Sequence, residues 1–227
     1  MMLRSDKGRN HRQVAIVDAQ GRTAAWTSPS INDWKGHHCG VNYCVQGNIL
    51  EGPEVIEAMS RSFESSSGPL AERLMDALDA AQAKGGDRRG MLSALLMILK
   101  PLAIQGFGDR ELDLRVDEHK TPLIELRRIL AAVRSGEMLA QASDSLLKKD
   151  FDAAFMRATE ARDKSPSNDN AWVMLANIHL HMGSKTEALA ALRQAVVLNP
   201  AHRKQLLRNK AFEALHGEAE FRSITGP

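Results

Sequence analysis

A repeat of thirty-four residues in the last third of the chain constrains the fold more than any other feature of this sequence. Small residues and a proline recur at this interval, so that Ala154, Ala158, Ala161 and Pro166 return as Ala188, Leu192, Ala195 and Pro200. Within each copy the small residues are three or four positions apart, which places them on one face of a helix. Each copy therefore predicts a helical unit that buries this face against a neighbouring unit.

The second copy resembles a tetratricopeptide repeat (TPR), a helix-turn-helix unit that implies a protein or peptide partner. The residues that carry this resemblance are Trp172, Leu175, Ala176, His179 and Gly183. We expect helices over roughly 135–149, 151–164, 169–182, 185–198 and 201–216. Two repeats are fewer than the three that commonly stand alone, so the last helix, the front of the chain or a second copy should cover the open end. We therefore expect docking between the two parts or a homo-oligomer.

The first helix of each pair should line the inner groove of such a module. The predicted groove residues are Asn170, Val173, Asn177, Leu180 and His181. Asn177 matches the asparagine of the carboxylate-clamp type of TPR domain, but Val173 stands where that type has a lysine. We therefore do not expect recognition of a free C-terminus. Trp172 is predicted to pack between helices rather than to anchor a partner.

The front of the chain mixes strand and helix signals. Two β-prone runs, 12–18 and 22–27, flank a turn at Gly21 and predict a hairpin. A loop is expected over 28–40, followed by a short strand over 43–46, and helices are expected over 53–64 and from Pro69 to the Gly85-Gly86 stop. The apolar run 92–99 predicts a strand buried on both faces. The alternation around 112–116 predicts a half-buried strand, and Pro122 opens a helix to about Arg134. This change of pattern divides the chain into predicted domains 1–134 and 135–227.

Four segments of the front half resemble, in order and spacing, a prokaryotic family of unknown function, domain-of-unknown-function 1028. They are Arg12–Gly21, Val45–Leu50 with Gly52–Val55, Gly85–Gly90, and Asp113–His119 followed by Pro122. This family is grouped with the N-terminal-nucleophile (Ntn) hydrolases, whose fold is a four-layer αββα sandwich. The resemblance implies an α+β fold, with a partial Ntn-hydrolase-like αββα sandwich followed by a short all-α TPR-like solenoid.

The resemblance also bears on catalysis. Ntn enzymes attack an amide carbonyl with the side chain of a first-residue Thr, Ser or Cys, whose own α-amine is the base. Relatives carry opening strands and a helix before the point where Met1 stands, and that segment holds the nucleophile. The family's glutamine after the double glycine is Leu92 here, and its cysteine near the tryptophan is Ile31. We therefore expect no catalytic residue in this chain, and we expect one sheet to present an unpaired edge that must be covered.

Three functional hypotheses follow. The first is a non-catalytic Ntn-like protein that binds a partner through its helical repeats. The second is an amide-bond hydrolase whose nucleophile segment is missing from this chain or supplied by another chain. The third is a scaffold without a ligand pocket.

Two loops of the front half are candidate ligand sites. Gly47 and Asn48 follow a strand and could hold an oxyanion through a backbone N–H and a side-chain amide. The alternative is ordinary Gly-Asn turn chemistry. Asp87, Arg88 and Arg89 lie between glycines, where guanidinium groups could bind a carboxylate or phosphate. The alternative there is a structural ion pair.

A third candidate site lies on the predicted strand at 112–116 and just after its end. Asp113 and Arg115 share one face of that strand and could line a pocket, and His119 could transfer protons. Alternating charge is equally typical of the solvated face of a strand. These residues are therefore candidate ligand contacts rather than an assigned site.

Composition excludes several classes of function. The formal net charge is +2 and the aromatic fraction is 4%, so neither nucleic acid nor a membrane surface is an expected partner. The polar opening has no apolar core of the length of a secretory signal, which predicts a cytoplasmic protein. Cys39 and Cys44 are then expected as free thiols. His37 and His38 beside them invite a zinc interpretation, but the spacing is poor, so we expect no metal, and no cofactor motif is present.

Overall fold

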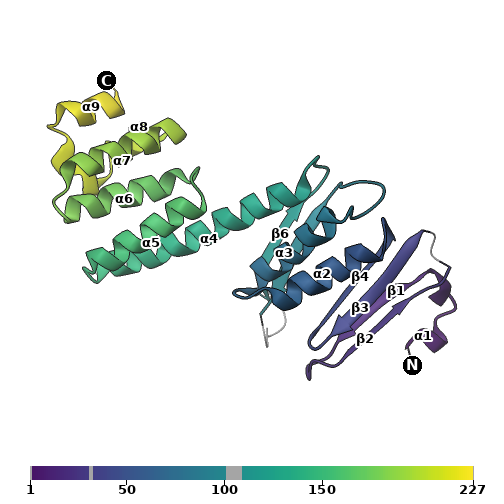
Figure 1. The fold of residues 1–227 in the computed structure, drawn as a ribbon. Helices are drawn as coiled ribbons and strands as arrows, with labels where there is room; N and C mark the ends of the chain where they lie inside the picture. The colour runs from purple at the N-terminus through teal and green to yellow at the C-terminus, as the bar shows by residue number, and fades with distance from the viewer. Residues whose placement is uncertain (1, 31–32, 101–108, 227) are drawn as a thin grey trace. The chain divides into compact units, whose positions relative to one another are not determined.

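The computed structural model describes residues 2–30, 33–100 and 109–226 (Figure 1). The chain divides into two compact units, residues 1–127 and 128–227. The first unit is α+β and the second is entirely helical, as the sequence predicts. The assignment of 1–134 and 135–227 as separate domains stays a prediction.

The first unit begins with two short helical segments and an antiparallel hairpin. These elements are α1 (Met2–Ser5), η1 (Arg9–His11), β1 (Gln13–Val17) and β2 (Thr23–Thr27). Gly21 adopts a φ of 75° in the connecting turn, a conformation that favours glycine. The hairpin predicted from the sequence is therefore confirmed.

A second hairpin follows, formed by β3 (Trp34–Gly40) and β4 (Tyr43–Leu50). The loop predicted over 28–40 is wrong for most of its length, because β3 takes its structure from pairing with β4 rather than from its own apolar pattern. The two strands meet at a turn in which Asn42 has a φ of 67°. β4 is also longer than predicted and carries Gly47 and Asn48 within the strand.

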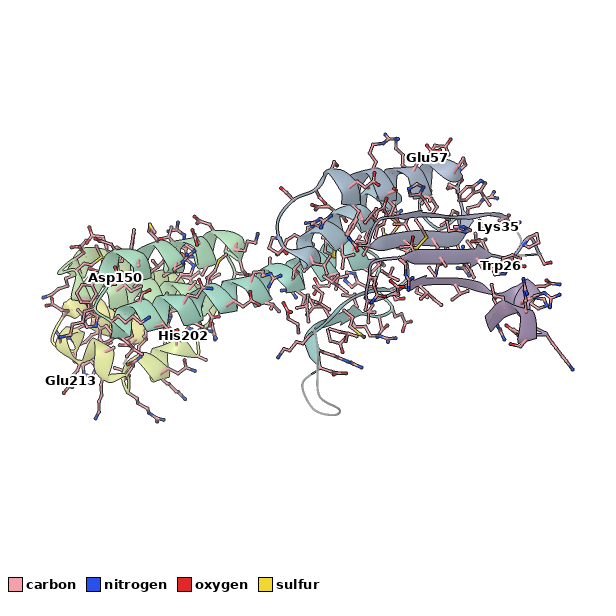
Figure 2. The ribbon with its side chains drawn as sticks, turned by 90° about the horizontal axis from the view of Figure 1, so that it is seen from below. Trp26, Lys35, Glu57, Asp150, His202 and Glu213 are labelled. Carbon is pink, nitrogen blue, oxygen red and sulfur yellow. A yellow bond between two sulfur atoms is a disulfide. The ribbon has the colours of Figure 1, made fainter. Side chains whose placement is uncertain are left out.

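This hairpin register also overturns the prediction of free thiols. Cys39 and Cys44 are directly opposite one another, with their Cα atoms 4.1 Å apart, and form a disulfide (Figure 2). Two cysteines only five positions apart face each other because the tight turn brings the strands back at once.

The two hairpins stack, and helices cover one of them. β1 lies against β4, and β2 against β3. The helices α2 (Pro53–Ser65) and α3 (Leu70–Ala83) confirm the two predicted helices, and α2 packs on β3 and β4. Their shared core contains Tyr43, Val45, Leu50, Val55 and Ile56. The order of layers is helix, sheet, sheet.

One side chain ties the two sheet layers together. The Gln13 amide nitrogen donates to the carbonyl oxygens of Gly36 and Gly47, at 3.1 and 2.8 Å. Since side chains alternate along a strand, Val14 and Ile16 point to the opposite face of β1, where they are 36% and 48% exposed. That outer face, with Trp26 and Ala24 from β2, lines a cavity of 470 Å³.

A third two-stranded sheet contains β5 (Ala94–Leu99) and β6 (Arg110–Val116), which pair antiparallel. Both strands are predicted from the sequence, but burial of β5 on both faces is wrong. Leu96 is 3% exposed, whereas Leu95 and Leu99 are 46% and 58% exposed. A two-stranded sheet with one covered face leaves the alternate side chains of an apolar run uncovered.

Helix α4 (Pro122–Leu147) runs without interruption through the expected break at Ser135. Ser135 does not end the helix, because its hydroxyl is fully buried and donates to the carbonyl oxygen of Ala161 at 2.8 Å. The Asn168 amide in turn donates to that hydroxyl at 2.8 Å. The residue at the predicted boundary between two helices is therefore engaged in tertiary hydrogen bonds.

The predicted repeat helices are confirmed as α5 (Phe151–Lys164), α6 (Asp169–His181) and α7 (Lys185–Leu198). Asp150 and Asn168 cap α5 and α6, accepting from the backbone N–H groups of Ala153 and Asn170. The single helix predicted over 201–216 is wrong. It is replaced by α8 (His202–Leu206), η2 (Lys210–Leu215) and α9 (Ala219–Thr225).

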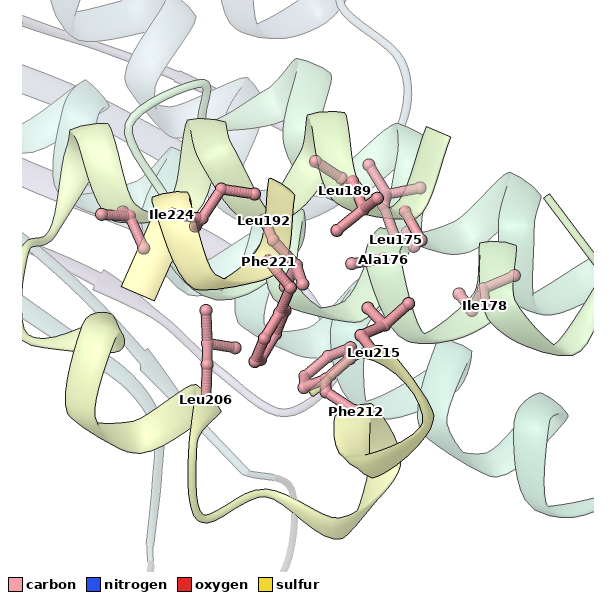
Figure 3. Packing of buried hydrophobic residues seen from close by; sticks show 14 of the residues in the cluster. Leu175, Ala176, Ile178, Leu189, Leu192, Leu206, Phe212, Leu215, Phe221 and Ile224 are labelled. Atoms are coloured by element: carbon pink, nitrogen blue, oxygen red, sulfur yellow. The ribbon is translucent and has the colours of Figure 1, made fainter. Parts of the chain in front are cut away.

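These last elements complete the core of the second unit. Phe212, Leu215 and Phe221 are fully buried, and they pack with the repeat helices around Leu175 and Leu192 (Figure 3). The C-terminal segment therefore supplies apolar surface to the second repeat, one of the three coverings that the sequence allows. Among the described residues, no helix combines the length and apolar character needed to cross a membrane.

Candidate functional site

The first unit contains a cavity of 630 Å³ between the end of β4, the helices α2 and α3, and the loop after α3. Most of its lining is apolar, including Ile56, Met59 and Leu78. Gly47, Asp87 and Arg89 contribute its polar groups among the predicted site residues. An apolar pocket with a few placed polar groups is typical of a ligand site.

Gly47 lines this cavity, but the Asn48 side chain is already engaged. The Asn48 amide nitrogen donates to the Gln13 side-chain oxygen at 2.8 Å, and the Gly47 carbonyl accepts from Gln13. The adjacent Ile49 has a φ of 57° at an irregularity in the β3–β4 register. The pair is thus held by the neighbouring sheet, and one N–H of the Asn48 amide is not available to a ligand in this arrangement.

The loop with the two arginines folds back on the end of β4. The Arg88 backbone N–H donates to the Ile49 carbonyl at 2.9 Å, and Leu50 pairs with Asp87. The Arg89 guanidinium hydrogen-bonds both oxygens of Asp87, at 3.0 and 2.6 Å. These bonds lower the pKa of Asp87 below its ordinary value and raise the pKa of Arg89.

The two arginines therefore have different environments. Arg89 lies on the cavity wall, paired with Asp87. Arg88 is directed to other carboxylates, with its guanidinium 3.1 Å from Asp33 and 3.8 Å from Glu51. Only Arg89 is placed to meet a ligand in the cavity, and its bidentate pairing with Asp87 would have to be shared or exchanged with that ligand.

Asp113 and Arg115 are not among the residues that line this cavity. They lie on the exposed face of β6, opposite Met97 and Leu95 of β5. Asp113 forms an ion pair with Arg110. The Arg115 Nε is 2.7 Å from Asp117, which raises the pKa of Arg115. This arrangement agrees with the alternative that Asp113 and Arg115 belong to the solvated face of a strand.

His119 and the histidine-cysteine cluster show no assembled site. The His119 Nδ1 accepts from the Thr121 backbone N–H at 3.1 Å. The His37 Nδ1 is 2.9 Å from the Thr27 hydroxyl, and both cysteine sulfurs are used by the disulfide. In the part of the chain that the structure describes, no three His, Cys, Asp or Glu side chains converge as metal ligands would.

The predicted groove residues of α6 have three kinds of environment. Asn170 and His181 are exposed, and the His181 ring stacks on Phe151 with centroids 5.3 Å apart. Val173 and Leu180 are half-buried and pack against the apolar cluster. Asn177 is half-buried, and its side chain makes no hydrogen bond to any described residue. The neighbouring Trp172 packs against the cluster, as predicted.

Sequence reasoning missed two parts of the site. Gln13, which joins the hairpins, was considered only as part of a family motif, although a lone glutamine in an apolar strand is a signal for a buried hydrogen bond. The residues after the double glycine, Met91 to Ala94, form one wall of the cavity. Their apolar character suggested a strand and not a cavity wall.

A helix-sheet-sheet unit with a polar-edged cavity, followed by TPR-like helices, defines a protein with an α+β unit and a helical repeat module. The model of a family of unknown function (DUF1028) matches residues 1–126, which is more than half of the chain. This chain belongs to that family. A tetratricopeptide-repeat model matches residues 145–209. Both resemblances predicted from the sequence are thereby confirmed.

One solved structure is a relative from the same family. It is protein SPO2555 from Silicibacter pomeroyi, which is 32% identical, with a TM-score of 0.48. The match covers 56% of this chain and 54% of that one, so this chain spans about half the length of the relative. No curated protein matches the chain.

Proposed function

We propose that this protein is a partner-binding member of the DUF1028 family, whose TPR-like unit holds a segment of another protein on the first-helix face of its repeats. The observation that carries this proposal is the Asn177 side chain. It is half-buried on that face, yet its amide makes no hydrogen bond to a described residue. The Asn177 amide atoms are not among the buried side-chain atoms that lack a hydrogen-bond partner, so they are accessible, and a peptide backbone can offer them both a donor and an acceptor.

Neighbouring positions support the same face. One period before Asn177 and His181, the corresponding residues of α4 are Ser143 and Leu147. Leu147 is 80% exposed, which is high for a leucine in a helix that ends in a packed module. Val173 in place of a clamp lysine favours an internal segment of the partner over a free C-terminal carboxylate.

Site-specific photocrosslinking tests this proposal. A benzophenone amino acid placed at Asn170, an exposed position on the first-helix face, should yield a discrete crosslinked partner in cells. The matched control places the same group at Val197, which is 69% exposed on the second helix α7. The partner identified from Asn170 should then bind purified Asn177→Ala about three- to tenfold more weakly, because the complex loses the hydrogen bonds between this amide and the partner. Equal crosslinking from both positions, or unchanged affinity, would refute the proposal.

The second candidate function is an amide-bond hydrolase of the Ntn type, with a nucleophile supplied from outside this chain. The 630 Å³ cavity favours it, because Gly47 and the Asp87–Arg89 pair lie on one wall. The engagement of Asn48 with Gln13 weighs against it. Release of a fluorescent amine from N-acyl aminocoumarins, measured in an extract of the source cells that holds the nucleophile-bearing chain and lowered when Arg89→Ala replaces the natural protein, would support this candidate. Equal rates for the two proteins would reject it.

Self-association and a cytoplasmic location remain predictions. Sedimentation of the purified protein over a hundredfold concentration range tests the first. A single species of monomer mass throughout would contradict it.

A further inference from the structure

Two strand edges in the first unit border the same pair of cavities. Within the described residues, β4 pairs with β3 and β5 pairs with β6, so each keeps one edge without a neighbouring strand. The 630 Å³ cavity touches β4 at Gln46 and β5 at Ala94, and a second cavity of 290 Å³ touches both strands further along. Met59 and Leu78 line both cavities. We call these two adjoining cavities together the strand groove.

The two edges run in opposite directions. The smaller cavity is lined by the start of β4, residues 43–45, and by residues 95–97 of β5. The larger cavity is lined by residues 46–47 of β4, by Ala94 at the start of β5 and by Ser93 just before it. As the numbers rise along β4 they fall along β5. The groove is therefore bounded by two antiparallel edges over about five residues, close to the length of an average strand.

The β4 edge offers backbone hydrogen bonds. In an antiparallel hairpin, residue pairs that exchange backbone hydrogen bonds alternate with non-hydrogen-bonded pairs, whose Cα atoms are closer together. The Cα separation of 4.1 Å marks Cys39 and Cys44 as a close pair, and His37 and Gln46 are the next such pair. The N–H and C=O groups of Cys44 and Gln46 therefore point away from β3, toward the groove.

The same edge already accepts extended backbone at its far end. There the Ile49 carbonyl accepts from the Arg88 N–H at 2.9 Å, and the Glu51 N–H donates to the Gly86 carbonyl at 3.1 Å. This pairing stops at the wall of the larger cavity, so the edge is occupied beyond Asn48 and open before it.

The roof of the groove determines which side chains fit. Met59, Phe63, Leu74, Ala77 and Leu78 of α2 and α3 face the cavities, and all are apolar. Alternate side chains of a strand point to one face, so an occupant would present an apolar residue at every second position to this roof. A helix does not suit the edges, because its own backbone groups are bonded internally.

We propose that the strand groove binds one extended segment of a partner polypeptide by strand addition between β4 and β5. The segment runs antiparallel to one edge and parallel to the other, because the edges oppose each other. Its backbone bonds Cys44 and Gln46, and its alternate apolar side chains pack under Met59 and Leu78. Backbone bonds then supply affinity and the roof supplies specificity. This site is separate from the first-helix face of the repeats.

Hydrogen exchange with a synthetic probe tests the groove. The probe is the capped peptide acetyl-Lys-Thr-Val-Thr-Val-Thr-Val-Lys-amide, and the control is the same peptide with N-methyl groups on the second and third valine residues. With the probe, exchange of the Cys44 and Gln46 amides should slow at least about tenfold, because each gains a hydrogen-bond partner. The N-methyl peptide should give no protection, because its two methylated nitrogens cannot donate hydrogen bonds to the strand edge that they face.

A protein variant gives an independent readout. Gln46→Pro removes the outward N–H without touching the bonds to β3, and proline is tolerated on edge strands. We expect it to weaken probe binding about tenfold relative to Gln46→Ala, which keeps the N–H. Equal binding of the two variants, or protection by the N-methyl peptide, would overturn the proposal. Protection that rises with protein concentration alone would assign the groove to a second copy and would also overturn it. The peptide control decides the matter if the proline variant does not fold.

Discussion

Reduction of the Cys39–Cys44 disulfide should lower the stability of the first unit by a definite amount. The bond closes a loop of cysteines five positions apart at the end of the β3–β4 hairpin. In the chain-entropy model, closing a loop of about six residues removes roughly 2 kcal/mol of entropy from the unfolded state. With a urea m-value of about 2 kcal/mol/M for a small domain, the unfolding midpoint should fall by about 1 M.

Tryptophan fluorescence can assign this loss to one unit. Trp26 and Trp34 report on the first unit and Trp172 on the second. In Trp172→Phe, the urea transition should move by about 1 M on reduction or in the double variant Cys39→Ser/Cys44→Ser. In a protein that keeps only Trp172, the transition should stay in place.

Two results would refute this reasoning. The first is a midpoint that moves by less than about 0.2 M, which means that the bond does not constrain the unfolded chain. The second is mass spectrometry of alkylated, unreduced protein that shows two free thiols. The second result would also restore the prediction that Cys39 and Cys44 are free thiols, as expected in a reducing compartment.

Other perturbations should act on particular contacts. Phe212→Ala removes a fully buried ring of the second unit and should cost about 3–5 kcal/mol in urea unfolding followed through Trp172, and a cost below about 1 kcal/mol would contradict the packing described. Gln13→Ala removes hydrogen bonds to part-buried polar groups of the second hairpin and should cost about 1–3 kcal/mol, whereas no change in the first-unit transition would show that the layers do not depend on this amide. Burial raises the pKa of Asp169, but hydrogen bonds from Asn199 and His202 outweigh it, so the pKa lies below its ordinary value. Its folded pKa is lower than its unfolded value, so the unfolded state binds more protons and this contribution is lost as pH falls below about 4. Asp169→Asn should flatten the pH dependence of second-unit unfolding between about pH 5 and 2, and an unaltered slope would contradict the assignment.

Local periodicity predicts most of the helices, and the reasons are visible in particular residues. Pro53 and the apolar spacing after it define α2, and Asp150 and Asn168 supply side-chain caps at the starts of α5 and α6. The errors occur where tertiary contacts override a local signal. The sequence predicts a boundary between two helices at 134–135, but Ser135 lies in the interior of α4 and donates its hydroxyl to the Ala161 carbonyl of α5.

The strands and the site depend on pairing that no local pattern contains. β3 includes two histidines and two glycines, and nothing but its register with β4 makes it a strand or brings Cys39 to Cys44. Of the candidate ligand contacts, Gly47, Asp87 and Arg89 share a cavity because the loop after α3 pairs with the end of β4. From the sequence alone, Asp113 and Arg115 are as good candidates for ligand contacts as Gly47, Asp87 and Arg89. Their strand, β6, however, belongs to a different sheet.

The uncovered outer face of the first hairpin has a practical consequence for anyone who purifies this protein. Val14, Ile16 and Trp26 border a cavity of 470 Å³, and Val14 and Ile16 are 36% and 48% exposed. Dyes whose fluorescence increases on binding to hydrophobic surfaces should therefore fluoresce with the fully folded protein at low temperature. Dye-based melting curves would start from a high baseline and resemble those of a partially unfolded protein. Intrinsic fluorescence or calorimetry is therefore the better measure of thermal unfolding.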